Sequence, residues 1–344
     1  MRWIPCVVRS TSRLGGLRVR VGHPLADEYL VFLGARARPN TVLATAFDLK
    51  VFFSVVGKPP TRVSSGDVFG FIRSQQTGEG DRTVVRLDGT SGVSSRTIRR
   101  RLSSVAGFYA YLVARGDTSV VRNPVPRGLA TRRERTRPGQ GVPLIRVPRT
   151  LPRILAPSEV DALFGVLRTD RDRAMVEAMV LVGLRRCEVL GLRVEDVRVG
   201  ERRLFIANGK GGRQRLIPAS PRFFATLGRY LDDERPAKTS TDRVFVVLKG
   251  PHRARPLTAY GLDEILDGAR RRAGLTRGTC HELRHTCLTR LREAGMSLEA
   301  LQAQAGHASI ETTRVYLHLA DDWLAAEYRK AAEAIDAQVL GVAR

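Results

Sequence analysis

The chain has few cysteines and no long apolar run. Its 344 residues contain only Cys6, Cys187, Cys280 and Cys287, whose spacing forms no disulfide framework, so a reducing cytosol is the simplest compartment. Cys280 and Cys287 flank two histidines, but one helix cannot easily wrap four ligands around a metal, so we expect structural thiols. The apolar run in residues 1–8 is too short for a signal peptide, and no segment approaches a membrane span. We therefore expect a cytoplasmic protein without membrane contact.

Acidic residues are scarce relative to basic ones. The chain has 58 Lys and Arg against 34 Asp and Glu, a formal net charge of +24, which predicts attraction to a polyanion such as nucleic acid. Most of the cations are arginines, whose guanidinium groups are the better forks for phosphate. Since 43% of the residues are hydrophobic, the chain is not a disordered basic tail. Its length allows two domains with sizeable cores.

Composition and periodicity divide the chain into four ranges. Residues 1–22 carry five arginines and no acid, and we expect this basic segment to become ordered only on a partner. Residues 23–126 have helical periodicity and form the first predicted domain. Residues 127–153 are rich in Pro and Arg and are predicted to be a stiff, basic linker. Residues 154–344 form the second domain, which ends in a tail helix.

The predicted fold is therefore two-domain and mainly α. In the first domain, Asn40 is expected to cap the second helix, a third helix begins near Ser65, and a long helix runs from Ser95 to Gly116. The second domain is mixed α+β. Its helices are interrupted by two β-like runs, 203–207 and 214–218, joined by N-G-K-G-G. This pattern predicts a small antiparallel hairpin with Lys210 at its turn.

Residues 279–319 carry side chains suited to phosphate chemistry. The stretch begins T-C-H-E-L-R-H-T-C and continues later as A-G-H-A-S-I-E-T-T-R-V-Y-L-H-L. His281 and Arg284 lie one helical turn apart, so both side chains can point at one spot. His307 and Tyr316 follow them. Imidazole and guanidinium groups donate hydrogen bonds to phosphate oxygens, and a phenol can attack phosphorus.

The same stretch allows a zinc peptidase as an alternative. Residues 281–285 match the H-E-x-x-H pattern, in which two histidines bind zinc and Glu282 is the base. Glu311 is a conceivable third ligand, whereas Arg284 inside the motif would repel the metal. A further alternative is a DNA-binding regulator without catalysis, which would need the basic surface alone.

Five motifs together resemble the active-site boxes of the tyrosine recombinases, the phage-integrase family. They are G-L-R-R-C-E-V-L-G-L, N-G-K-G-G-R-Q-R-L-I-P, H-E-L-R-H-T, A-G-H-A-S and T-T-R-V-Y-L-H. In order, they supply the predicted catalytic residues Arg185, Lys210, His281, Arg284, His307 and Tyr316. The resemblance covers roughly residues 155–320 at motif level and residues 25–120 more loosely. Ala305 stands where the family usually has Leu, which changes packing only.

The resemblance implies a helical, SAM-like core-binding domain followed by a catalytic domain. It implies a site-specific recombinase or integrase that acts on double-stranded DNA, assembles as a tetrameric synaptic complex and associates with the nucleoid. A type IB topoisomerase, which uses similar chemistry as a monomer, is the related alternative. The resemblance also implies that a segment after the nucleophile docks into a neighbouring subunit. An apolar stripe suits that role: Leu324, Tyr328, Ala331, Ile335 and Val339.

The chemistry of DNA strand transfer assigns a role to each residue. Arg185 and Arg284 can bind the non-bridging oxygens, and Lys210 can protonate the leaving 5′ oxygen. His281 can exchange a proton with the Tyr316 nucleophile, and His307 can donate to a phosphate oxygen. Because the phosphotyrosine conserves the bond energy, we expect no metal, cofactor or ATP requirement. Glu188, one turn from Arg185, is predicted to orient it, and Tyr328 is the rival nucleophile.

Overall fold

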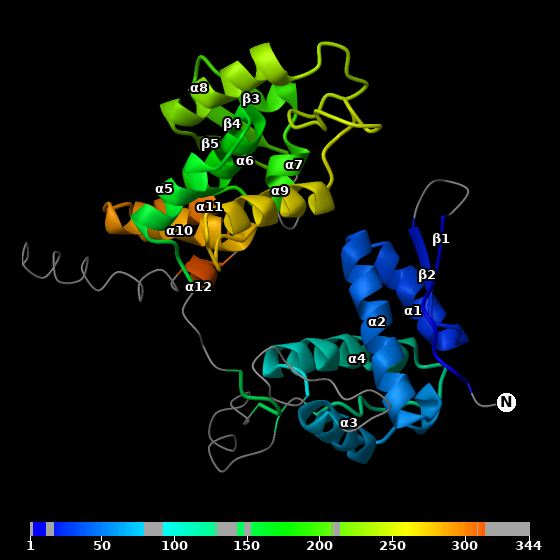
Figure 1. The fold of residues 1–344 in the computed structure, drawn as a ribbon. Coiled ribbons are helices and arrows are strands. Elements are labelled where there is room, and N and C mark those ends of the chain that lie inside the picture. Colours follow the sequence, from blue (N-terminus) through cyan, green and yellow to red (C-terminus); the bar gives the residue numbers. More distant parts are fainter. Residues whose placement is uncertain are drawn as a thin grey trace, which may run out of the picture. The chain divides into compact units, whose positions relative to one another are not determined.

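The computed structural model describes residues 3–11, 17–78, 92–126, 128, 143–147, 153–207, 209, 214–307 and 309–313. The chain forms two compact units, Met1–Arg149 and Thr150–Arg344, and both are mainly helical (Figure 1). The predicted fold class, mainly α with a small antiparallel sheet, is confirmed. Most of the predicted linker lies outside the described residues, and the predicted domain limits stay predictions.

The first unit begins with a two-stranded antiparallel sheet. Strands β1, Val8–Thr11, and β2, Leu17–Arg20, pair with Arg9 opposite Val19. Val19 and the following Val21 are buried against Leu30 and neighbouring helical residues. The expectation that this segment is ordered only on a partner is therefore wrong for the described residues. Alternation of valine and arginine gives β2 an apolar face, which the helices cover.

Four helices and one short 3-10 turn complete the described part of this unit. They are α1 (Pro24–Gly34), α2 (Pro39–Val56), η1 (Pro60–Arg62), α3 (Ser65–Thr77) and α4 (Ser95–Arg115). The Ser94 side chain caps α4, and Gly116, with φ +73°, ends it as predicted. The expected cap at Asn40 is wrong, because α2 begins at Pro39 and its cap position is Arg38. A proline fits the first helical position, where the backbone N–H needs no partner.

Helix α2 is the central helix of the first unit. Among the described residues it is the one helix long and apolar enough to cross a membrane by length and composition, so the expectation that no segment approaches a membrane span is wrong for this helix. Here it packs against α1, α3 and α4 instead, with Leu49, Phe52 and Phe53 buried. Phe52 meets Phe71 of α3 edge to face, so the apolar side chains of α2 form a protein core.

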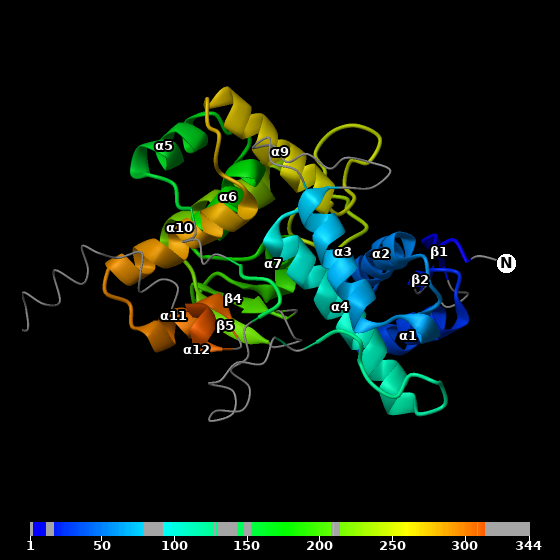
Figure 2. The ribbon, with the colours of Figure 1, turned by 90° about the horizontal axis from the view of Figure 1, so that it is seen from below.

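The second unit contains all six predicted site residues. Its described helical elements are α5 (Pro157–Gly165), α6 (Asp170–Val180), α7 (Arg186–Gly191), η2 (Val194–Asp196), α8 (Pro221–Arg229), η3 (Tyr230–Glu234), α9 (Ala259–Arg272), α10 (Cys280–Glu293), α11 (Leu298–Ala305) and α12 (Ile310–Thr313). The buried helix α6 packs between α8 and α10. Figure 2 shows α11 beside strand β5, to which it is joined by a hydrogen bond from Arg215 to Gln304.

A three-stranded antiparallel sheet lies in this unit, in the order β3-β4-β5. Its strands are β3 (Val197–Arg198), β4 (Arg203–Ile206) and β5 (Arg215–Pro218). The hairpin β4–β5 was predicted, whereas β3 was not. Leu204 pairs with Ile217 and both are buried. Because side chains alternate along a strand, Arg215 shares the inward face of β5 with Ile217.

Candidate active site

Helix α10 places His281 and Arg284 through a strong start signal. Thr279 and Glu282 form a reciprocal capping box, in which the Glu282 carboxylate accepts from the backbone N–H groups of Thr279 and Gly278 at 2.9 and 3.0 Å. The helix therefore begins at Cys280. Since Glu282 is used by the cap, its carboxylate serves the fold of this site.

Arg284 is almost fully buried, with 3% of its surface exposed. Its guanidinium donates to the carbonyl oxygens of Gly183 and, at 2.6 Å, Ala305. It also donates to Nε2 of His307 at 3.3 Å and lies 3.7 Å from a carboxylate oxygen of Glu188. Contacts from three other segments thus fix the plane of this guanidinium.

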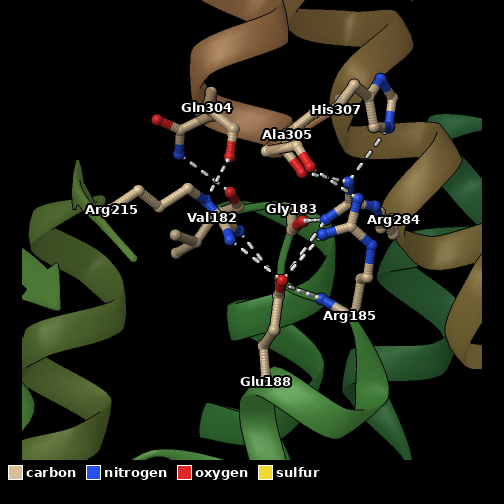
Figure 3. A network of polar contacts seen from close by, with 10 residues as sticks. Val182, Gly183, Arg185, Glu188, Arg215, Arg284, Gln304, Ala305 and His307 are labelled. Atoms are coloured by element: carbon tan, nitrogen blue, oxygen red, sulfur yellow. Dashed lines mark hydrogen bonds and ion pairs between the residues drawn. The ribbon is translucent and has the colours of Figure 1, made fainter. Parts of the chain in front are cut away.

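Glu188 is the centre of the polar network drawn in Figure 3. Its Oε1 accepts from Nη1 of Arg185 at 2.8 Å, and its Oε2 accepts from the Arg185 backbone N–H at 2.9 Å. Arg185 also donates to the carbonyl of Gly306 at 3.1 Å. The prediction that Glu188 orients Arg185 is confirmed. Because one carboxylate faces three guanidinium groups, those of Arg185, Arg215 and Arg284, the cluster has an excess of positive charge.

The arginines determine the ionisation of Glu188. Burial by itself would raise the pKa of this carboxyl, but hydrogen bonds from Arg215 and the Arg185 backbone, with both positive charges, lower its pKa from 4.5 to about 2. The carboxylate is therefore ionised throughout the physiological range and holds the guanidinium groups permanently.

His307 follows the end of α11 and contacts Arg284 through Nε2. A guanidinium can only donate, so Nε2 is the acceptor and Nδ1 carries the ring proton. Nδ1 lies 3.0 Å from the hydroxyl of Thr313 in α12, to which it donates. Burial, with the charges of Arg284 and Arg185, lowers the pKa of His307 to about 4. At neutral pH the ring is therefore neutral.

His281 is paired with the second histidine of α10. The Nε2 atoms of His281 and His285 lie 2.8 Å apart, and the rings meet edge to face. One ring must therefore donate and the other accept. Burial and the nearby charges of His281 and Arg284 lower the pKa of His285 to about 4, so His285 is a neutral partner for His281.

Three of the predicted residues, Arg185, His281 and Arg284, line one pocket of 710 Å³. His307 lies at the other side of Arg284 and lines a neighbouring groove of 610 Å³. Four of the six predicted residues thus belong to one connected site. Lys210 and Tyr316 lie outside the described residues, and their roles stay predictions.

Two residues of the network were not predicted. Arg215 binds Glu188, and Gln304 of α11 donates from Nε2 to the carbonyls of Val182 at 2.9 Å and Pro218 at 3.2 Å. The alternation of β5, which puts Arg215 on the same face as buried Ile217, was an available signal. Gln304 lies in the last turn of α11 between two alanines and had no comparable signal.

The described residues do not favour a metal centre. No group of three or more His, Cys, Asp or Glu side chains among them is arranged to hold an ion. Burial raises the pKa values of Cys280 and Cys287 to about 12, so both thiols are protonated at neutral pH. Cys280 instead donates to Asp263 at 3.7 Å.

Comparison of the sequence with known proteins identifies relatives of one kind. Residues 153–322 match the phage integrase family. The chain is 29% identical over 310 residues to the tyrosine recombinase XerD of Listeria monocytogenes, covering 86% of this chain and 94% of that protein. It is 34% identical to XerC of Roseiflexus castenholzii over 237 residues, which are 66% of this chain and 69% of the relative.

Solved structures have the same fold. The Tn1549 transposon integrase in complex with transposon right end DNA aligns with a TM-score of 0.66 at 19% identity, over 90% of this chain and 98% of that one. A lambda integrase dimer bound to a core site aligns with a TM-score of 0.61 at 16% identity, over 87% and 95%. With the sequence relatives, this establishes that the chain belongs to the tyrosine recombinase, or phage integrase, family.

Proposed function

We propose that the chain is a site-specific DNA recombinase that cleaves and rejoins strands through a 3′-phosphotyrosyl intermediate. Tyrosine recombinase is the name of its sequence relatives, and structural neighbours are bound to DNA. The observation that carries the proposal is the arrangement of Arg185 and Arg284. Both are held by Glu188 and both line the pocket that His281 also lines.

The arginine pair suits a phosphodiester in the act of strand transfer. A pentacoordinate phosphorus carries more charge on its non-bridging oxygens than the ground-state diester does. Groups that are already oriented stabilise this charge without reorganising during the reaction. Since Glu188 and backbone carbonyls hold both guanidinium groups, Arg185 and Arg284 meet this requirement.

His307 can change its role when DNA is bound. Without DNA, its Nε2 accepts from Arg284 and the ring is neutral. A bound phosphate would offset the positive charges that lower the pKa of His307, so its pKa would rise. A proton on Nε2 would then make His307 a donor to a phosphate oxygen. His281, beside neutral His285, is positioned to exchange a proton with the nucleophile.

Tyr316 and Lys210 supply the remaining roles, nucleophile and general acid. Tyr316 follows Thr313 by three residues, a separation of at most about 11 Å along the chain, and Thr313 is bonded to His307. Lys210 precedes Arg215, which is bonded to Glu188, by five residues. The site is therefore within reach of both residues. The phosphotyrosine stores the energy of the broken bond, so religation needs no ATP, and these side chains provide each catalytic role without a metal.

We infer that four chains assemble on two duplexes, with the C-terminal apolar stripe docked on a neighbouring copy. The groove of 610 Å³ between β5 and α11 supports a docking site, because Leu216, Ile217, Met296 and Ala300 line it. Docking there would couple assembly to catalysis, since His307 and Arg215 line the same groove. A DNA-acting enzyme of this kind would associate with the nucleoid.

The proposal is tested by covalent capture from a library of duplexes with a randomised core, in excess EDTA. Complexes that survive denaturant are collected, sequenced and re-selected, and the enriched duplex is then tested for strand exchange. We expect an enriched site, a protein–DNA adduct and recombinant products. Retention of duplex under native conditions with no complex that survives denaturant would indicate a binding protein, and relaxation without exchange would indicate a topoisomerase.

A further inference from the structure

Arg215 makes the most extensive contact with Glu188. Its Nη1 and Nη2 donate to Oε1 and Oε2 of Glu188, both at 3.0 Å, and its Nε donates to the carbonyl of Gln304 at 3.3 Å. The Arg215 side chain is 12% exposed and that of Glu188 is fully buried. Two parallel bonds between a guanidinium and a carboxylate fix the plane of both groups.

The plane of Glu188 matters because the same two oxygens hold the phosphate-binding arginines. Oε1 also accepts from Arg185, while Oε2 accepts from the Arg185 backbone and faces Arg284. A rotation of the carboxylate would therefore move the partners of both arginines. Arg215 itself lines the groove beside His307 and is not among the residues lining the pocket of Arg185 and His281.

The turn at Gly306 is built around the Arg215 guanidinium. Gly306 has φ +60°, and a Cβ on it would lie 2.8 Å from Nη1 of Arg215. A side chain at this position would be strained and would displace the guanidinium from Glu188. The carbonyl of Gly306 meanwhile accepts from Arg185. Gly306 thus leaves room for the Arg215 guanidinium, and its carbonyl oxygen binds Arg185.

We propose that Arg215 is a positioning residue for strand cleavage, which locks Glu188 in the orientation that aims Arg185 and Arg284 at the scissile phosphate. The proposal rests on the recombinase function argued above. The proposal also connects the β4–β5 hairpin to the site, because Arg215 is the first residue of β5.

The test compares Arg215→Gln and Arg215→Lys with Arg222→Gln. Arg222 is a matched control, because it pairs with another buried glutamate of the same unit, Glu177, at 3.1 Å, away from the site. On the enriched duplex, Arg215→Gln should reduce the cleavage rate by about 100-fold, as misplacement of catalytic groups does, while DNA affinity stays within about twofold. Arg215→Lys keeps the charge but loses the planar fork, so it should restore less than a tenth of the rate.

A second measurement does not depend on activity. In the DNA-free full-length protein, the arginine Nε–H signals of Arg185 and Arg284 are followed by NMR. Arg215→Gln should shift or broaden both signals, and Arg222→Gln should leave them unchanged. Unchanged signals in Arg215→Gln, full activity of Arg215→Lys, or equal losses of affinity and rate would each overturn the proposal. Absence of a wild-type adduct would instead count against the recombinase function, and the NMR comparison would still decide the role of Arg215.

Discussion

Replacement of Glu188 by Gln tests the centre of the network. Gln has nearly the shape of protonated Glu, so the variant imitates a site whose carboxyl has lost its charge. A fall of the pKa from 4.5 to about 2 corresponds to about 3 kcal/mol of folding free energy, at about 1.36 kcal/mol for each pKa unit. Loss of one partner from a buried ion pair generally costs about 3–5 kcal/mol, which is the same range.

The pH dependence of the free energy of unfolding shows whether the ionised Glu188 carboxylate stabilises the fold. The folded-state pKa of Glu188 lies below its unfolded-state value, so its contribution is complete above the unfolded-state pKa of 4.5 and is lost as the pH falls toward about 2. The free energy of unfolding of Glu188→Gln should therefore be lower than that of wild type by about 3 kcal/mol at neutral pH. The difference should shrink steadily as the pH is lowered from 4.5.

Glu177→Gln is the matched control, for which we do not expect the loss of unfolding free energy predicted for Glu188→Gln. Glu177 is also buried and paired with an arginine, Arg222. Burial raises its pKa despite the partner, so the ionised form weakens the fold at neutral pH, and replacement by Gln should be neutral or stabilising. Both variants are compared by urea denaturation, with hydrogen exchange assigning the transition to the second unit. Equal destabilisation by the two substitutions, or a Glu188→Gln difference independent of pH, would refute this reasoning.

Three further predictions concern parts of the chain outside the described residues. Lys210→Ala should cleave ordinary DNA slowly, but its cleavage rate should recover on DNA in which sulfur replaces the bridging 5′ oxygen, because a thiolate leaves without protonation. The cleavage rate of Arg284→Ala should not recover on that DNA, because this variant still lacks stabilisation of the phosphate charge. The predicted linker carries four clustered arginines, Arg132, Arg133, Arg135 and Arg137. Neutralising all four should weaken binding to every DNA sequence and reduce the slope of log affinity against log salt by up to about 3.6. An unchanged slope would mean that these arginines contact no phosphate. Truncation after Asp322 should leave single-site binding intact while abolishing synapsis and strand exchange, and recombination at the full-length rate would exclude the tail as a subunit tether.

Local signals in the sequence predicted most of the helices. The stop signal Gly116 acts within one turn of its helix, so the sequence around it is sufficient. The strand β3 could not be predicted in the same way. It has only two residues, and Val197 is a strand residue only because it pairs with Leu204. The β1–β2 sheet likewise depends on the helices that cover Val19.

The contacts of the site likewise fall into two kinds, those that follow from nearby sequence and those that depend on distant residues. The spacing of His281 and Arg284 follows from helix geometry over three residues. The approach of Glu188 to Arg185 follows from the capping box at the start of α7, which is also local in the sequence. The burial of Arg284 could not be predicted, because its acceptor at Gly183 is 101 residues away. The pairing of Arg215 with Glu188 similarly depends on the packing of β5 beside α7 across 27 residues.

The attachment point of the DNA tests the central claim most directly. The adduct on the enriched duplex is digested with trypsin, and the DNA-linked peptide is fragmented in the mass spectrometer. Cleavage after Arg314 and Arg329 leaves Tyr316 and Tyr328 in one peptide, so fragment ions must locate the phosphate. We expect a 3′-phosphate on Tyr316, a free 5′ hydroxyl on the other strand end, and no adduct from Tyr316→Phe. A phosphate on Tyr328 or on any other residue, or an adduct that persists in Tyr316→Phe, would contradict the account.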